Sequence, residues 1–97
     1  MTEISVEFKV IHNEEENRFE VNLNGDVALI EYLWLGDHIT FVHTEVPKAF
    51  SGKGIAGQMA KTALEFAREK HLRVSSICTF MDVYLKRHPE YNDLLNK

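Results

Sequence analysis

The chain has 97 residues, a hydrophobic share of 44% and a formal net charge of −4 at pH 7. This length fits one compact domain over residues 1–97, and no apolar run approaches the roughly 20 residues that span a bilayer, which excludes a membrane-spanning helix. The acidic balance argues against nucleic-acid binding, and a single cysteine excludes an internal disulfide and a metal site built on several thiolates.

The first half of the chain alternates apolar and polar residues with the period of β-strands. This alternation predicts a first strand over residues 4–10 and a second over 19–23, joined by a polar loop over 12–17. Asn24-Gly25 follows, and it is a strong hairpin signal because both residues tolerate the positive φ of a type I′ turn.

The next two segments continue the strand pattern. Residues 27–35 are apolar on both faces and predict a central strand, Gly36-Asp37 marks a turn, and residues 38–43 predict a fourth strand. Four consecutive strands with short connections indicate an antiparallel meander.

After Pro47 the pattern becomes helical. Ile55, Met59 and Ala63 recur every four residues, which predicts an amphipathic helix over residues 54–70. A fifth strand is expected over residues 72–78.

A second helix is expected to begin at Thr79, because Thr79 and Asp82 resemble a capping box, and to stop before Pro89. A short helical turn over residues 89–95 would follow it. The resulting fold class is α+β (mixed α/β): an antiparallel four-strand meander followed by helix, strand and helix.

The glycine-rich turn before the long helix, residues 51–57, is the most informative segment. Its glycines allow a sharp turn and a close approach of the backbone to a ligand, and the first amides of the helix lack partners within it. A phosphate or pyrophosphate would satisfy those amides, and Lys53 adds a positive charge. The alternative is a turn that only connects two elements.

A dinucleotide-binding site is the rival interpretation of this turn, because its glycines fit G-x-G-x-x-G. That fingerprint should open the first βαβ unit and be followed about 20 residues later by an acidic residue. Here antiparallel strands come first, and the later position holds Ile77 and Cys78. We therefore reject this interpretation, together with a Walker-type loop, which would need Gly-Lys-Ser/Thr.

The turn resembles the acetyl-CoA motif of the GNAT acetyltransferase superfamily, Gln/Arg-x-x-Gly-x-Gly/Ala. The first position of this motif is a long polar Gln or Arg, whereas this chain has Ser51 there. The phosphate contact that the long side chain makes in the family is therefore either lost or supplied by Lys53. Val46-Pro47 before the turn and Cys78 after the helix resemble a family of short, stand-alone GNAT-like proteins of about this length.

The resemblance implies a place for each part of acetyl-CoA, in a sheet splayed where the cofactor enters. The pantetheine arm is expected to pair with the backbone of Thr44, Glu45 and Val46 like an added strand. The pyrophosphate is expected on the amides of residues 52–57. The turn that binds it comprises Ser51, Gly52, Lys53, Gly54, Ile55, Ala56 and Gly57.

Three side chains are candidates for the chemistry of acetyl transfer to an amine. Tyr84 could protonate the departing thiolate, since a phenol is neutral at pH 7. Cys78 could accept the acetyl group first, because a helix N-terminus favours a thiolate. His43, placed by alternation on the face of Ile39 and Phe41, or Glu45, could take the proton of the amine. For each residue the alternative is ordinary packing or hydrogen bonding.

The sequence thus predicts an acetyl-CoA-dependent N-acetyltransferase that acts by direct transfer or through Cys78. A non-catalytic acyl-CoA binding module and an interaction domain without a nucleotide are the alternatives. The histidines form no metal-ligand pattern, so no metal is expected. The lack of a signal-peptide pattern leads us to expect a cytoplasmic protein, and we expect a monomer.

Overall fold

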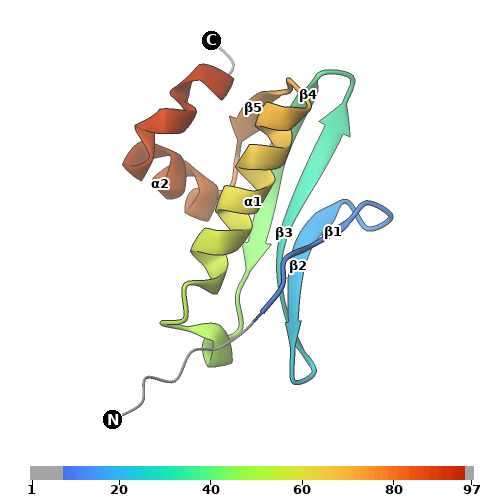
Figure 1. The fold of residues 1–97 in the computed structure, drawn as a ribbon, viewed down its shortest axis with the longest axis vertical. Coiled ribbons are helices and arrows are strands. Elements are labelled where there is room, and N and C mark those ends of the chain that lie inside the picture. The colour runs from blue at the N-terminus through green and yellow to red at the C-terminus, as the bar shows by residue number, and fades with distance from the viewer. Residues whose placement is uncertain (1–7, 96–97) are drawn as a thin grey trace.

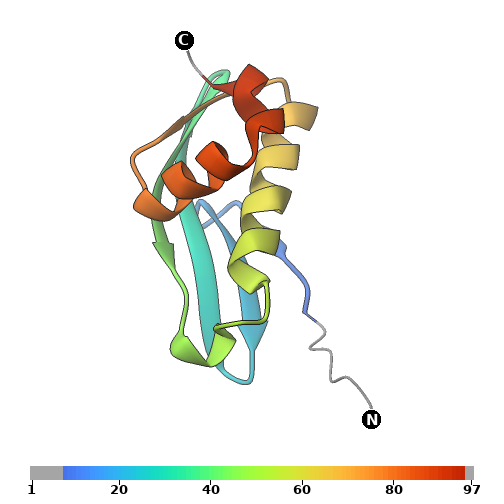
Figure 2. The ribbon, with the colours of Figure 1, turned by 90° about the vertical axis from the view of Figure 1, so that its left-hand side faces the viewer.

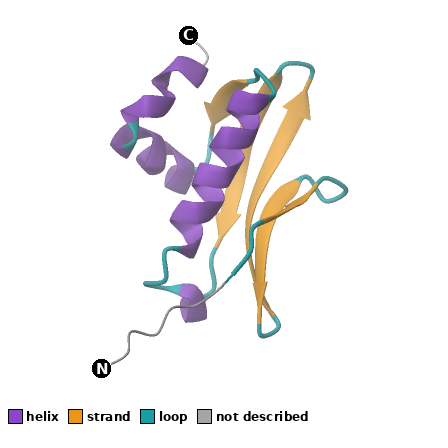
Figure 3. Ribbon diagram, viewed as in Figure 1, coloured by secondary structure: helices purple, strands orange, loops and turns teal. Residues whose placement is uncertain are grey.

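Five strands form one sheet in the order β1-β2-β3-β4-β5 in the computed structural model, which describes residues 8–95. The first four are antiparallel neighbours, and β5 pairs with β4 in parallel. The helices cover one face of this sheet (Figures 1 and 3). The elements are β1 (Ile11–Asn13), β2 (Arg18–Leu23), β3 (Asp26–Leu35), β4 (His38–Glu45), the 3₁₀ turn η1 (Lys48–Phe50), α1 (Ile55–Glu69), β5 (Arg73–Ser76), α2 (Thr79–Arg87) and the 3₁₀ segment η2 (Pro89–Leu94). The expected α+β fold is confirmed.

The turn between β2 and β3 has the geometry expected from Asn24-Gly25. The φ angles are 52° at Asn24 and 86° at Gly25, so both residues are left-handed, as a type I′ turn requires. Leu23 and Asp26 are paired directly on either side of it. This turn fixes the register of β2 against β3, which places Phe19 opposite Ile30 on the helix-covered face.

The prediction of the first strand was wrong in its position. Within the described residues, 8–10 form no strand, and β1 begins only at Ile11; residues 4–7 of the predicted strand lie outside the described part. Phe8 and Val10 pack against the core without pairing to a neighbour, which explains why their alternation resembled a strand. His12, assigned to a loop, lies in β1 with its ring stacked on Phe19 at 4.2 Å.

The bounds of the later elements differ slightly from those expected. β4 continues to Glu45, two residues beyond the prediction, and β5 is shorter than the predicted 72–78. The second helix begins at Thr79 as expected, but Thr79 is not its cap: Cys78 occupies the N-cap, and no side chain caps this end. The capping box was therefore the wrong reason for a correct boundary.

The core lies between the sheet and α1. Ile55, Met59 and Ala63 are buried, as their spacing predicted, and they belong to the same core cluster as Ile30 and Phe41 of the sheet. Burying each large apolar side chain contributes about 1.5–3 kcal/mol. This packing holds the start of α1 beside the lower halves of β3 and β4, where the candidate site is found (Figure 1).

No helix within residues 8–95 is long and apolar enough to cross a membrane.

Candidate functional site

β4 and β5 separate halfway along β4. The two strands pair from His38 to Phe41, and the Ile77 N–H donates the last bond of this ladder to the Phe41 carbonyl at 2.9 Å. Beyond that bond β4 runs on to Glu45, while the other chain turns away into α2 (Figure 2). Among the described strands, none pairs with this edge of β4 past Phe41. The result is an open backbone edge beside a wedge-shaped cleft.

A cavity of about 260 Å³ occupies this cleft. One wall comes from β4 and the other from the β5–α2 junction, so the cavity joins segments that are more than 30 residues apart in the sequence. Its lining residues are Val42, His43, Thr44, Ile77, Cys78, Thr79 and Phe80.

A β-bulge at Val42 decides which side chains of β4 face the helices. His43 pairs with Glu31, but Phe41 pairs with Tyr32, so Val42 is an extra residue in β4. Because cross-strand partners share a face, Thr44, opposite the buried Ile30, lies on the same face as Phe41.

His43 therefore lies on the opposite, open face of the sheet, and its expected place on the face of Ile39 and Phe41 was wrong. The His43 Nε2 instead pairs with the Glu45 carboxylate at 2.9 Å, and both side chains are exposed. No hydrogen bond within the described residues joins His43 to Cys78 or Tyr84. His43 lines the cleft from the other side of β4.

Thr44, and not His43, lies next to the Cys78 thiol. The Thr44 Oγ1 lies 3.0 Å from the Cys78 Sγ, and the cysteine is only 5% exposed. Ser76 holds the backbone of Cys78 from the other side: its hydroxyl accepts from the Cys78 N–H at 3.2 Å and lies 3.1 Å from the Cys78 carbonyl. Ser76 was not predicted as a site residue, although a serine two residues before a helix cap is a common local turn signal.

Two left-handed glycines precede the start of α1. Gly52 and Gly54 have φ angles of 75° and 73°, which only glycine adopts readily. The first helical bond runs from the Gln58 N–H to the Gly54 carbonyl at 3.0 Å, so the amides of residues 55–57 precede the helical ladder. No side chain caps this end and no acidic residue occupies the first turn. Ser51 and Lys53 are exposed beside it.

Gly57 lies inside α1, as the helix predicted over residues 54–70 implies. It lies in the first turn of α1 without a positive φ, and a Cβ built there would meet the Tyr84 ring at 4.0 Å. The glycine is therefore the point where α1 and α2 approach each other. This contact places Tyr84 next to the same helix start that offers its amides.

Tyr84 is half-buried on the side of α2 that faces α1. Its ring stacks on His88 at 3.9 Å and lies 6.3 Å from Phe80. Burial raises the pKa of Tyr84, and the negative charges of Glu90 and Glu65 add to this effect. Tyr84 is consequently a neutral phenol at physiological pH. The His88 Nδ1 donates to the Tyr84 carbonyl at 2.8 Å, a contact that was not predicted from the sequence.

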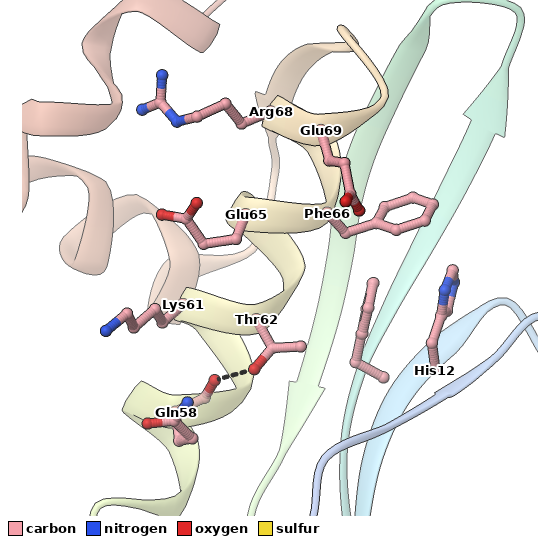
Figure 4. Close-up of a pocket in the computed structure, with 9 residues that line it drawn as sticks. His12, Gln58, Lys61, Thr62, Glu65, Phe66, Arg68 and Glu69 are labelled. Carbon is pink, nitrogen blue, oxygen red and sulfur yellow. Dashed lines mark hydrogen bonds between the residues drawn. The ribbon is translucent and has the colours of Figure 1, made fainter.

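A larger cavity, of about 560 Å³, lies on the other flank of α1, next to β1. The His12 ring forms one side of it, and Phe66 approaches that ring edge-on at 4.5 Å (Figure 4). Lys61 and Arg68 point away from His12 in the same view, so their charges do not converge on this space. No group of three or more metal-ligating side chains occurs within residues 8–95.

Comparisons with known proteins show the family and the fold of this chain. A family profile described as GCN5-related N-acetyl-transferase matches residues 18–94. Protein NATD1 of Mus musculus is 39% identical over 84 residues, which are 84% of this chain and 76% of that protein. Protein NATD1 of Danio rerio is 34% identical over 94 residues, covering 92% of this chain and 86% of that protein. A solution NMR structure of a GCN5-like protein from Staphylococcus aureus superposes with a TM-score of 0.72 at 26% identity, covering 91% of this chain and 87% of that one.

Proposed function

We propose a function from one premise: this chain belongs to the GCN5-related N-acetyltransferase family. Its proposed activity is the transfer of an acetyl group from acetyl-CoA to an amine. The observation that carries this proposal is the separation of β4 and β5 beside the uncapped start of α1. An open strand edge and a set of free helical amides meet there, and acetyl-CoA has an amide-bearing arm and a diphosphate to match them.

The described residues fit acetyl-CoA in two ways. The free edge of β4 at Thr44 and Glu45, continuing to Val46, offers backbone groups to the amides of the pantetheine arm, as in β-strand addition. The amides of residues 55–57 lie at the positive end of the α1 dipole and suit the pyrophosphate. Lys53 supplies the positive charge that Ser51 cannot supply.

The proposed chemistry uses groups on both sides of the cleft. Bound acetyl-CoA supplies the activated acyl thioester. The His43 imidazole, held at its Nε2 by Glu45, accepts the proton of an amine that approaches from the open face of the sheet. The neutral Tyr84 phenol donates a proton to the departing thiolate from the helix side. Direct transfer is favoured over a covalent route because the Cys78 thiol is buried and already paired with Thr44.

A non-catalytic acyl-CoA binding module is the second candidate. Two observations favour it: Ser51 stands where the family motif has a long polar side chain, and the His43 ring is turned to the opposite face of the sheet from Thr44 and Cys78. In that case acetyl-CoA would bind in the same cleft without being consumed.

Titration with acetyl-CoA and with CoA tests the binding step. Its readout is the change in the amide chemical shifts of residues 52–57. Incubation of the acetyl-CoA complex with a panel of amines, with free CoA as the readout, tests transfer. Mass spectrometry of the protein alone detects an acetyl group on Cys78, and the Cys78→Ala variant shows whether it is required. Binding without CoA release supports the second candidate. Unchanged amide chemical shifts at millimolar acetyl-CoA contradict both the acetyltransferase and the binding module.

A further inference from the structure

The last turn of α2 departs from helical geometry and leaves one carbonyl without its usual partner. In a regular helix the His88 N–H would bond to the Tyr84 carbonyl, four residues back. Here the His88 N–H donates instead to the Leu85 carbonyl at 3.3 Å. His88 has a φ of −129° and a ψ of 73°, outside the helical region, because the Pro89 ring disfavours helical backbone at the residue before it. The Tyr84 carbonyl therefore loses its helical donor.

The side chain of His88 takes the place of that donor. Its Nδ1 donates to the Tyr84 carbonyl at 2.8 Å, and since a carbonyl oxygen only accepts, the hydrogen lies on Nδ1. This bond holds the imidazole over the preceding helical turn, where residues four apart are neighbours. The imidazole consequently lies flat on the Tyr84 ring, with the ring centroids 3.9 Å apart and the planes at 14°.

The Tyr84 ring has a second neighbour in α1. A Cβ built at Gly57 would meet the Tyr84 Cε2 at 4.0 Å, so the first turn of α1 passes beside the edge of the ring. Phe80, one turn earlier in α2, lies 6.3 Å away and is tilted by 37°. Among residues 8–95, His88 is the one aromatic side chain that lies flat on Tyr84. The phenol is thus held between the imidazole and the start of α1.

We propose that His88 is a positioning residue for the acid Tyr84. Stacking by the imidazole holds the phenol ring beside the start of α1, and the bond to the Tyr84 carbonyl holds the imidazole itself. This inference rests on the proposed function, because it takes Tyr84 as the proton donor to the departing thiolate. The placement of the ring can still be measured without any turnover.

Two variants separate the stacking from the hydrogen bond. His88→Asn keeps a side-chain donor for the carbonyl and removes the ring, whereas His88→Phe keeps a flat ring and removes the donor. A misplacement of about 1 Å can cost roughly 10²-fold in rate, so His88→Asn should lower kcat by about that factor without changing the affinity for acetyl-CoA. His88→Phe should retain most of the wild-type kcat.

Stability should follow the opposite order. Loss of the capping bond should lower the urea midpoint of His88→Phe more than that of His88→Asn. A merely structural role of His88 predicts instead that kcat falls with stability, so that His88→Phe is the less active variant. That result would overturn the proposal. Arg87→Asn, at the exposed residue next to His88, is the matched control and should keep the wild-type kcat.

The Tyr84→Phe background tests whether His88 acts through the phenol. There His88→Asn should cause no further loss of kcat, because no proton donor remains to be misplaced. Two losses that multiply in the double variant, or a wild-type kcat in the single His88→Asn variant, contradict the positioning role. His88→Ala removes both the ring and the donor, and it keeps the test decisive should His88→Asn not fold.

The aromatic NMR signals of Tyr84 decide the matter if no amine is acetylated. The ring current of the imidazole should displace these signals in the wild-type protein and in the Arg87→Asn control. His88→Asn should move them toward the values of an unstacked tyrosine, and His88→Phe should keep them displaced. With this pattern and no turnover, the stacking stands and the proposed transfer fails. Identical Tyr84 signals in His88→Asn and wild type overturn the placement, whatever the turnover.

Discussion

Thr44 and Cys78 are 34 residues apart in the sequence, and their side-chain oxygen and sulfur lie 3.0 Å apart. This contact joins the free half of β4 to the start of α2 across the cleft. It exists because the bulge at Val42 turns Thr44 toward the helices. The two residues thus connect the proposed pantetheine edge with the element that carries Tyr84.

Replacing Thr44 by Val tests the strength of this contact. The substitution keeps the β-branched shape and removes the hydroxyl, so the Cys78 thiol loses its partner. We expect the free energy of unfolding to fall by about 1 kcal/mol. Urea denaturation measures the change. Thr40→Val, on the open face of the same strand, is the matched control and should stay within about 0.5 kcal/mol of wild type. Equal effects of the two substitutions would contradict a specific contact.

Alanine at Gly54 and at Gly57 should have opposite effects on stability. Gly54 has a φ of 73°, where a Cβ costs roughly 1–2 kcal/mol, so Gly54→Ala should lower the melting temperature. Gly57 is helical and the new Cβ would make only an ordinary contact with Tyr84, so Gly57→Ala should raise stability by roughly 0.5–1 kcal/mol. Thermal unfolding followed by circular dichroism distinguishes the two. A stabilised Gly54→Ala variant would disprove the left-handed cap.

The Tyr84→Phe variant should lose turnover without losing affinity for acetyl-CoA. If the phenol donates the proton to the departing thiolate, kcat should fall roughly 10²- to 10⁴-fold. Burial raises the pKa of Tyr84, with Glu90 and Glu65 adding to it, so loss of its proton should not limit activity below about pH 10. Tyr91→Phe is the control, because the Tyr91 hydroxyl donates to Glu65 at 2.7 Å and has no proposed catalytic role. A comparable kcat for Tyr84→Phe and wild type would remove the acid from the mechanism.

His12 should make the protein less stable in acid. Its Nε2 lies 2.7 Å from the Tyr32 hydroxyl and its ring stacks on Phe19. Burial lowers the pKa of His12, an effect that Glu14 partly offsets. The unfolded chain therefore takes up a proton near pH 6.5 more readily than the folded protein.

Stability linked to His12 is consequently complete above about pH 6.5 and is lost as the pH falls below it toward the folded pKa. Urea unfolding at pH 8 and pH 5.5 measures this difference. His12→Phe keeps an aromatic ring against Phe19 and removes the titration, so its stability should depend less on pH over that interval. An equal slope in both proteins would assign the effect to other groups.

The local elements of the fold could be predicted from consecutive residues. Asn24-Gly25 specified its turn because backbone dihedral preferences belong to the residues themselves. The stripe of Ile55, Met59 and Ala63 specified a helix and its buried face because side-chain direction follows the helical period. The same local reasoning failed for β1. Phe8 and Val10 are partly buried by packing without strand pairing, and the aromatic partners of His12 come from distant elements.

The sequence by itself determined the order of the elements, the glycine turn and the family resemblance, because each depends on neighbouring residues. Only the tertiary structure decided which side chains meet in the cleft. The extra residue at Val42 reverses the alternation of β4, and it is recognisable only from the pairing of β4 with β3. It turned His43 outward and brought Thr44 to Cys78. Such a reversal depends on the register between two strands, which no single stretch of sequence contains.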